Sequence, residues 1–200
     1  MLENFAGLDE NRIKNLLTTI KNSSEKAFEL LENLLVWANA QTGQIVFSPQ
    51  PVNLRSLIEE SISLMDGPAS NKGIRIAIAM KDDPMAFGDQ HMIRTVLRNL
   101  ISNAVKYTPF GGEIVVSVSL DDDQVKISIR DSGIGIPKED IQKLFRIESK
   151  YSTRGTADEK GTGLGLILCK EFIDKHGGKI WVESEEGKGS TFSFTVPVGR

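Results

Sequence analysis

The stretch from Gln90 to Tyr107 reads QHMIRTVLRNLISNAVKY. Its apolar residues recur at the spacing of an α-helix, and at about 100° per residue they gather on one face. That face comprises Ile93, Val96, Leu97, Leu100, Ile101 and Ala104. Asn99, Asn103 and Lys106 share a different stripe. The stretch therefore predicts a helix that packs one face into a core and presents two amides and a lysine together elsewhere.

Apolar residues on both sides of this helix repeat with period two, which is typical of half-buried strands. We predict strands over 74–80, 114–120, 125–129, 180–182 and 192–194. The acidic triplet 121–123 separates two of these strands and is interpreted as a solvated hairpin turn.

Three further helices are predicted among the strands. Asn53 caps the first, and Gly67-Pro68 ends it. The second is short and follows Pro137, and the third runs from about 164 to 176 and ends in two glycines. A sheet covered by helices on one face is the simplest architecture for this order of elements.

Residues 9–42 are predicted to form one long helix, because their apolar residues alternate spacings of three and four. Asp9 can cap this helix, and Gly43 ends it. Additional apolar positions widen the stripe, so we expect pairing with other helices in a four-helix arrangement. The segment 48–51, SPQP, lacks two backbone donors and is the predicted boundary. The expected domains are thus 1–47 and 48–200.

Composition restricts the class of protein. Of 200 residues, 40% are hydrophobic and 26% are charged, which excludes a disordered polyelectrolyte, a collagen-like repeat and a membrane-embedded bundle. The net charge is -3 and no basic run stands out, so we expect no nucleic-acid partner. Cys169 lies in an apolar stretch, as a reduced, buried cysteine would. No apolar run approaches the roughly 20 residues of a spanning helix, and we expect a cytoplasmic protein.

The polar stripe of the 90–107 helix can bind a ligand. Two asparagines four residues apart and a lysine three residues further offer neutral oxygens and one positive charge to a common point. Phosphate and a hard cation fit such a point, and Mg²⁺ needs few protein oxygens when phosphates and waters supply the rest. The solvated face of an ordinary amphipathic helix has the same pattern. The helix by itself leaves both interpretations open.

The second motif is Asp131-Ser132-Gly133-Ile134-Gly135-Ile136-Pro137, which follows a predicted strand. Its two glycines let a ligand approach the backbone closely, and the carboxylate of Asp131 can accept a hydrogen bond from an exocyclic amine such as that of adenine. A tight turn before a helix would have a similar sequence.

The third motif is Gly161-Thr162-Gly163-Leu164-Gly165-Leu166, which opens a helix. The unpaired N–H groups of a helix start bind anions, and glycines allow phosphate oxygens to come near. The motif follows no strand and no Walker sequence occurs, so Rossmann and P-loop sites are excluded. The polar segment 146–160 before it is either a lid over phosphates or a solvated loop.

In their order and spacing, the three motifs resemble the ATP-binding catalytic domain of sensor histidine kinases, in the superfamily with gyrase, heat-shock chaperones and mismatch-repair ATPases. Residues 99–107 resemble the N box, 131–135 the first glycine box and 161–166 the second. The closing stretch 176–192 is also similar to that family. The resemblance covers 48–200 and implies an α+β fold, a two-layer α/β sandwich whose mixed sheet is covered by helices on one face and preceded by the long N-terminal helix.

The resemblance also implies roles for individual residues. Asn103 would hold Mg²⁺, Asn99 and Lys106 would contact the phosphates of ATP, Tyr107 would lie along adenine, and Asp131 would accept from its amino group. The remaining implied ATP contacts are Gly133, Gly135, Ile136, Gly161, Thr162, Gly163, Leu164, Gly165 and Leu166. Lid contacts would come from Arg146, Lys150, Tyr151, Arg154 and Lys160.

Asn99 bears on the reaction. Hydrolysing relatives place a water-activating glutamate there, and an amide cannot accept a proton. A positioned general base contributes typically 10²- to 10⁴-fold, so its absence favours transfer of the phosphoryl group over hydrolysis. The sequence departs from the family at Glu148, where a second phenylalanine often stands, and Tyr151 is the candidate substitute.

The phosphoacceptor histidine of the family has no counterpart in the sequence. Residues 1–47 resemble the second helix of the dimerisation and phosphotransfer hairpin, and the first helix is expected to lie outside this chain. We interpret both His91 and His176 as solvated or capping residues, and His176 lies at a helix C-terminus, where the dipole favours a cation. The resemblance implies three partners: a phosphoacceptor histidine domain, a response regulator that binds the full-length protein, and a second copy bound through the N-terminal helix.

The main hypothesis is a kinase module that takes ATP and Mg²⁺ and donates the γ-phosphoryl group to a histidine outside this chain, without autophosphorylation. Two alternatives remain at this point. One is a serine kinase or slow ATPase of the same superfamily, and the other is a nucleotide-sensing interaction module.

Overall fold

The computed structural model describes most of the chain from residue 46 onward and a few positions before it. The described residues are 9, 12, 13, 16, 17, 20, 46–81, 83–121, 123–146, 154–157, 159 and 163–199. The chain divides into two compact units, 1–44 and 45–200. In the first unit, Asp9 Oδ1 accepts a hydrogen bond from Arg12 N at 2.7 Å, so Asp9 caps the helix as predicted. The rest of the predicted 9–42 helix, with its end at Gly43, lies largely outside the described residues.

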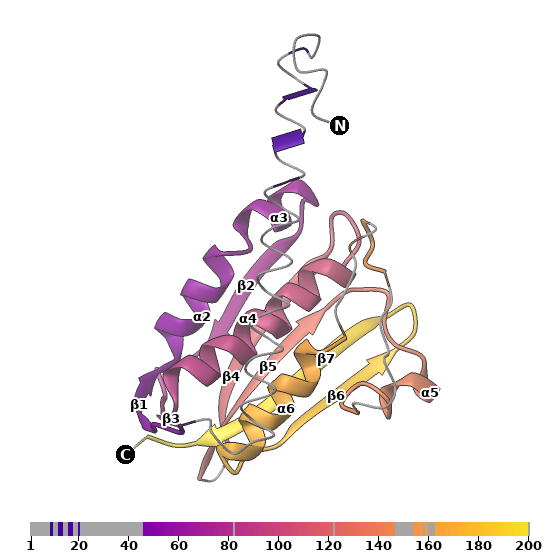
Figure 1. Cartoon of the computed structure of the whole chain (residues 1–200). Coiled ribbons are helices and arrows are strands. Elements are labelled where there is room, and N and C mark those ends of the chain that lie inside the picture. Colours follow the sequence, from indigo (N-terminus) through magenta and orange to yellow (C-terminus); the bar gives the residue numbers. More distant parts are fainter. Residues whose placement is uncertain are drawn as a thin grey trace. The chain divides into compact units, whose positions relative to one another are not determined.

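The described part of the second unit contains a five-stranded sheet with the order β2-β4-β5-β7-β6 (Figure 1). β2 pairs with β4 in parallel, and the other neighbours are antiparallel, so the sheet is mixed as predicted. Each predicted strand is present. The strands are β2 (Arg75–Met80), β4 (Glu113–Asp121), β5 (Gln124–Asp131), β6 (Ile180–Glu185) and β7 (Gly189–Pro197). β4 and β5 form a hairpin with the exposed Asp123 at its tip, so a turn is present as predicted, but Asp121 still belongs to β4 and pairs with Gln124.

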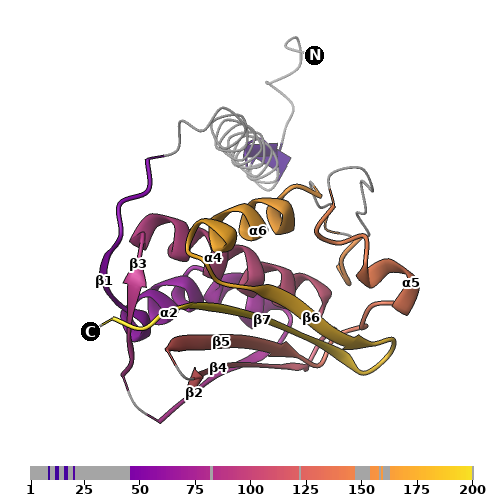
Figure 2. The same ribbon diagram turned by 90° about the horizontal axis from the view of Figure 1, so that it is seen from below.

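Three helices lie on one face of this sheet, and α4 lies between the other two (Figure 2). They are α2 (Leu54–Ser63), α4 (Gln90–Tyr107) and α6 (Gly165–Lys175). Their apolar stripes pack against alternate residues of the strands, because successive strand side chains point to opposite faces. The fully buried side chains include Leu54, Ile58, Leu97, Leu100, Ile114, Ile127, Phe172 and Phe194. The predicted two-layer α/β sandwich is confirmed.

A second, two-stranded sheet was not predicted. β1 (Gln50–Asn53) pairs antiparallel with β3 (Met85–Gly88). Each strand has four residues and shows no clear alternation of apolar residues, and β1 contains Pro51. Proline is tolerated on an edge strand, where no ladder donor is required. Gln50 and Pro51 of the predicted boundary segment 48–51 thus belong to a strand of the second unit.

The helix that follows β1 is shorter than predicted. Asn53 caps α2 through Oδ1, which accepts from Ser56 N at 2.9 Å, as predicted. Gly67 and Pro68, however, do not end the helix. They lie in the first turn of a separate helix, α3 (Asp66–Asn71), where proline needs no hydrogen-bond partner for its nitrogen. The short helix α5 (Lys138–Ile141) follows Pro137 as predicted.

Two expectations about apolar residues can be compared with the structure. Cys169 is fully buried, and burial raises the pKa of its thiol, which fits a core residue. Among the described helices, none has the length and apolar character needed to cross a membrane.

Candidate functional site

α4 begins and ends where its sequence predicts. Asp89 caps it: Oδ1 accepts hydrogen bonds from His91 N at 3.0 Å and Met92 N at 3.1 Å. The predicted apolar face is completely buried, and the stripe that carries Asn99 and Asn103 is half-buried. The core thus holds the helix in one rotation about its axis, and this rotation fixes the direction of the polar stripe.

Asn99 meets the start of α6. Its Nδ2 donates to Thr95 O at 3.2 Å, and its Oδ1 lies so close to Gly165 that a Cβ built there would be 2.3 Å away. A side chain in place of Gly165 would therefore require the Asn99 amide to move. Gly163, just before it, has a φ of 74° that favours glycine. The described end of the second glycine motif thus lies against the asparagine stripe.

Asp131 ends β5 with its side chain 6% exposed. Oδ1 accepts from Gly133 N at 2.8 Å and from Ser190 N at 3.2 Å. Burial raises the pKa of Asp131 to about 6 from its ordinary 3.8, although these two hydrogen bonds act in the opposite direction. Oδ1 is engaged by the backbone, which leaves Oδ2 as the oxygen that can accept from a ligand.

The loop after Asp131 packs on the end of α4. Ile134 N donates to Tyr107 O at 3.2 Å, and a Cβ on Gly133 would meet that same carbonyl oxygen at 2.7 Å. On its other side the loop contacts the connection between β6 and β7. Gly187 N donates to Ile134 O at 2.7 Å, and Ile136 N donates to Ser184 Oγ at 2.9 Å. The structure thus brings together the three motifs that the sequence separates by tens of residues.

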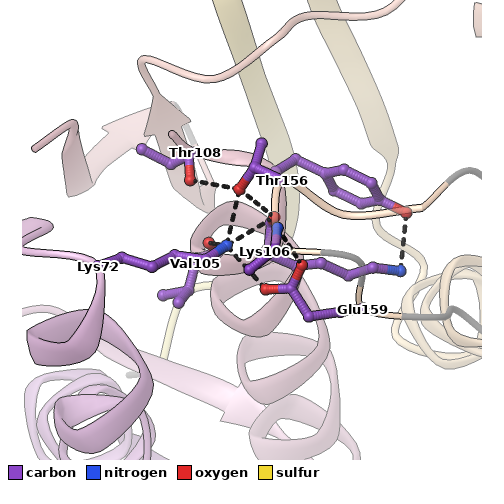
Figure 3. A network of polar contacts seen from close by, with 8 residues as sticks. Lys72, Val105, Lys106, Thr108, Thr156 and Glu159 are labelled. Atoms are coloured by element: carbon purple, nitrogen blue, oxygen red, sulfur yellow. Dashed lines mark hydrogen bonds and ion pairs between the residues drawn. The ribbon is translucent and has the colours of Figure 1, made fainter. Parts of the chain in front are cut away.

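The last carbonyls of α4 accept hydrogen bonds from four different segments. Helix ends leave such groups without partners inside the helix. Ala104 O accepts from Thr108 N, and Tyr107 O accepts from Ile134 N in the loop after Asp131, which we call the glycine loop. Val105 O and Lys106 O each accept from Lys72 Nζ at 3.0 Å, and Lys106 O also accepts from Thr156 N at 3.0 Å (Figure 3). Lys106 Nζ in turn lies 3.0 Å from Tyr107 Oη.

Comparison with known proteins identifies the family. Residues 88–200 match the family described as histidine kinase-, DNA gyrase B-, and HSP90-like ATPase. The chain belongs to this family. The match begins at the end of β3 and includes all three motifs, so this chain has the ATP-binding domain of the histidine kinase-, gyrase- and HSP90-like ATPases.

Curated relatives include a sensor protein and a sensor histidine kinase. The chain is 33% identical over 193 residues to the sensor protein GacS of Pseudomonas syringae pv. syringae, a match that covers 92% of this chain and 21% of GacS. It is 46% identical over 111 residues to the sensor histidine kinase WalK of Bacillus subtilis strain 168, covering 54% of this chain and 18% of WalK. The chain therefore spans about a fifth of the length of these relatives.

Solved structures show the same fold. The catalytic domain of histidine kinase ThkA aligns with a TM-score of 0.66 and 34% identity, covering 75% of this chain and 95% of that domain. ThkA in complex with the response regulator protein TrrA aligns with a TM-score of 0.72 and 26% identity, covering 96% and 53%. These likenesses support an ATP-binding kinase module of a two-component sensor, and they do not favour the serine-kinase, ATPase or nucleotide-sensing alternatives.

Several predicted contacts of this ATPase-family site lie outside the described residues. They are Lys150, Tyr151, Lys160, Gly161 and Thr162, and the departure at Glu148 lies there too. Of the other predicted lid contacts, Arg146 and Arg154 are exposed. Leu164 and Leu166 are half-buried at the start of α6, and Ile136 is half-buried in the glycine loop.

Sequence reasoning missed three residues of the site. Lys72 is 5% exposed, and its ammonium group contacts the end of α4. Thr156 contacts one of the same carbonyl oxygens, Lys106 O, and Ser190 donates its backbone N–H to Asp131. A single lysine in a loop has no periodicity or motif, so only its burial in the folded chain reveals it. The family-like closing stretch did contain Ser190, but nothing in its sequence pointed to Asp131.

The two histidines have the solvated and capping roles that the sequence predicted. His91 is exposed. His176 is the C-cap of α6 and is 5% exposed. Its Nε2 accepts from Asp89 N at 2.9 Å, so the ring proton is on Nδ1, which donates to Phe172 O at 2.6 Å. A neutral ring follows, because the backbone N–H of Asp89 can only donate.

Proposed function

We propose that residues 48–200 bind ATP with Mg²⁺ and donate the γ-phosphoryl group to a histidine outside this chain. One observation carries the proposal: α4 contacts the loop after Asp131 through Tyr107 O and the start of α6 through Asn99. Asp131 offers a carboxylate to an amine. The asparagines and Lys106 offer amide and ammonium groups to phosphates, and the glycine-lined start of α6 offers a site for an anion.

The proposed roles are those that the family resemblance implies for these residues. Asp131 Oδ2 accepts from the adenine amino group, and Tyr107 lies along the ring. Asn99 and Lys106 contact phosphates, and the N–H groups at the start of α6 bind phosphate oxygens because the helix dipole is positive there. Gly133, Gly135 and Gly165 keep the backbone within reach of the ligand.

Mg²⁺ would be held by Asn103 together with the phosphates and water. The described residues contain no group of three His, Cys, Asp or Glu side chains that could hold a metal by themselves. An amide oxygen beside phosphates is a donor set that suits Mg²⁺, which keeps several waters. The ion supplies charge compensation for the phosphate oxygens.

The chemistry of Asn99 favours transfer. Its Nδ2 donates to the backbone and its Oδ1 faces Gly165, and neither atom can take a proton from water. In the proposed step, a neutral imidazole nitrogen of the acceptor attacks the γ-phosphorus, an N–P bond forms, and the bond to the β–γ bridging oxygen breaks. ADP leaves. The absent base lowers hydrolysis by roughly 10²- to 10⁴-fold relative to a site that has one.

The N-terminal unit supports a further part of the proposal. We propose that residues 1–47 are the second helix of a phosphotransfer hairpin, that this helix pairs with a second copy, and that the longer protein works in the cytoplasm with a response regulator. The exposed apolar side chains of Leu16, Leu17 and Ile20 support pairing.

The transfer reaction can be tested directly. The chain is incubated with ATP labelled at the γ-phosphate, with and without a separately supplied phosphoacceptor hairpin. We expect acid-labile, base-stable phosphate on the added hairpin and none on the chain. Label on this chain alone, phosphoserine on the hairpin, or rapid release of free phosphate without transfer would each contradict the proposal.

The proposed metal contact gives a second test. Asn103→Ala should weaken ATP binding roughly 10-fold when Mg²⁺ is present and less than 2-fold when it is chelated, since one oxygen ligand of the ion is lost. Calorimetric titration with ATP under both conditions measures this. Ser102→Ala, which alters a half-buried neighbour off the stripe, is the matched control. Equal affinities of N103A and the parent with Mg²⁺ present would refute the ligand role.

A further inference from the structure

Lys72 is a buried lysine between α3 and β2, far along the chain from the motifs of the ATP site. Its side chain is 6% exposed, yet its ammonium group has four polar neighbours. These are Val105 O at 3.0 Å, Lys106 O at 3.0 Å, Thr156 Oγ1 at 2.8 Å and Glu159 Oε1 at 2.7 Å (Figure 3). A buried ammonium group is costly unless it is paired and hydrogen-bonded, and here both conditions are met.

Two of these neighbours are carbonyl oxygens in the last turn of α4. That turn is the negative end of the helix dipole, and its carbonyls have no partner within the helix. Lys72 therefore supplies a cation and donors where both are needed. The residue whose carbonyl it contacts, Lys106, and the next residue, Tyr107, carry the side chains assigned above to phosphate and adenine.

The other two neighbours belong to the segment that precedes the second glycine motif. We call residues 154–157 and 159 the Thr156 turn. Within it, Gly155 N donates to Glu159 O at 2.9 Å, and Ala157 N donates to Glu159 Oε2 at 2.8 Å. Glu159 thus closes the turn with one carboxylate oxygen and pairs with Lys72 through the other. Partial burial of this carboxyl favours its neutral form, but the hydrogen bond from Lys72 and those within the turn lower its pKa overall.

Thr156 adds contacts that do not involve Lys72. Its N donates to Lys106 O at 3.0 Å, and its hydroxyl lies 2.9 Å from Thr108 O. Gly155 is packed so tightly that a Cβ would meet Lys106 Cγ at 2.5 Å and Lys106 O at 2.9 Å. The Thr156 turn therefore lies directly on the residue that the proposed function assigns to phosphate.

We infer that Lys72 is a positioning residue, which fastens the Thr156 turn to the carboxyl end of α4 and thereby sets the placement of Lys106 for the triphosphate. The expected effect on ATP binding rests on the proposed function. The contacts that fasten the turn to α4 do not require nucleotide. Lys72 is too deeply buried to contact ATP, so it acts through its neighbours.

The fastening is tested on the nucleotide-free chain by trypsin. Arg154 is exposed at one end of the turn, and cleavage after it requires the turn to leave α4. Lys72→Met removes the ammonium group and keeps the apolar stem, and Glu159→Gln leaves Lys72 in place while removing its charged partner. We expect cleavage after Arg154 to be about 10-fold faster in K72M and about 3-fold faster in E159Q. The double variant should be no faster than K72M.

The consequence is tested by ATP binding and by the transfer reaction. We expect both variants to raise the Kd and the KM for ATP, about 10-fold for K72M and about 3-fold for E159Q, with kcat within 2-fold of the parent. Lys126→Met is the matched control, because Lys126 lies over the Trp181 ring, 5.1 Å from its centroid, on the sheet and away from the site. Urea unfolding of both variants distinguishes destabilisation of the fold from displacement of the Thr156 turn. If K72M has a lower urea midpoint and E159Q has the parental midpoint, the weaker ATP binding of E159Q cannot be due to unfolding.

Two results would overturn the inference. The first is cleavage after Arg154 at the parental rate in both variants, which would show that the pair does not fasten the turn. The second is faster cleavage with an unchanged Kd for ATP. A parent chain that binds no ATP would instead refute the proposed function, and the cleavage rates would still report the fastening alone.

Discussion

Asp131→Asn is expected to make the protein more stable at neutral pH while it weakens the binding of ATP and ADP by roughly 10- to 100-fold, the loss of one or two strong hydrogen bonds. The two effects have one origin. Asp131 is held by backbone donors in a buried site, and its charge is costly there when no ligand is bound.

The stability effect follows from the raised pKa. Asp131 has a folded pKa of about 6 against 3.8 ordinarily, so between these values the folded chain binds more protons than the unfolded chain. The contribution of this group to the free energy of unfolding is therefore full below pH 3.8 and falls as the pH rises toward 6. The total is about 3 kcal/mol, since one pKa unit is 1.36 kcal/mol. Asparagine is neutral at every pH and should remove this slope.

The binding effect follows from geometry. Asparagine can keep its carbonyl oxygen where Oδ1 accepts from Gly133 N and Ser190 N. Its NH₂ group then replaces Oδ2 and meets the amino group of adenine, so two donors face each other. ATP and ADP should lose affinity equally because they share adenine. In the parent, protonation of Oδ2 should likewise weaken binding as the pH falls below about 6.

Calorimetric titration and urea unfolding between pH 5 and 8 measure both effects. Asp174→Asn, at an exposed residue of α6, removes the same charge and is the control. A flat pH profile of ADP affinity in the parent would contradict the role of Asp131. So would a D131N variant that binds ATP normally, or one whose stability follows the parental pH dependence.

The sequence predicted those elements whose apolar residues recur with a regular spacing over several turns or strand positions. The bounds of α4 followed from an apolar period over five turns, and the strands followed from alternation that only a half-buried sheet requires. β1 and β3 have four residues each and pair over a long separation, so no local period marked them. Pro68 could either end a helix or lie in the first turn of the next one, and the local sequence is compatible with both. In the folded chain it lies in the first turn of α3.

The site divides in the same way. Asp131, the asparagines and the glycines lie in motifs whose spacing is visible in the chain, and the fold brings them together. Lys72 and Thr156 contact the same carbonyl oxygen from positions 84 residues apart, and neither lies in a motif. The hydrogen bond that His176 Nε2 accepts comes from Asp89 N, which is 87 residues away in the sequence. Roles that depend on single distant partners need the folded structure.

Gly135→Ala is expected to lower the free energy of unfolding by at least about 3 kcal/mol, whereas Gly187→Ala should lower it by about 1 to 2 kcal/mol. Both glycines have positive φ, 69° and 79°, which L-residues adopt at a cost. They lie in segments that contact each other, since Gly187 N donates to Ile134 O. Their surroundings differ.

A Cβ on Gly187 would have no atom within 4 Å, so the left-handed backbone accounts for its whole cost. A Cβ on Gly135 would lie 2.0 Å from Glu185 O and 2.9 Å from Glu186 Cα, which are backbone atoms that cannot rotate away. The glycine loop must then separate from the β6–β7 connection, and this movement pulls on the bond between Ile134 N and Tyr107 O at the end of α4.

Urea unfolding followed by circular dichroism compares the two variants with the parent, and ATP titration under native conditions follows the site. We expect G187A to bind ATP within 2-fold of the parent and G135A to bind at least 10-fold more weakly or to be unfolded in buffer. Equal destabilisation by the two changes would mean that the close approach to Glu185 carries no energy beyond backbone strain. The first glycine motif would then be a turn that precedes a helix. Its contact with α4 would no longer explain how the Asp131 carboxylate and the asparagine stripe keep their relative positions.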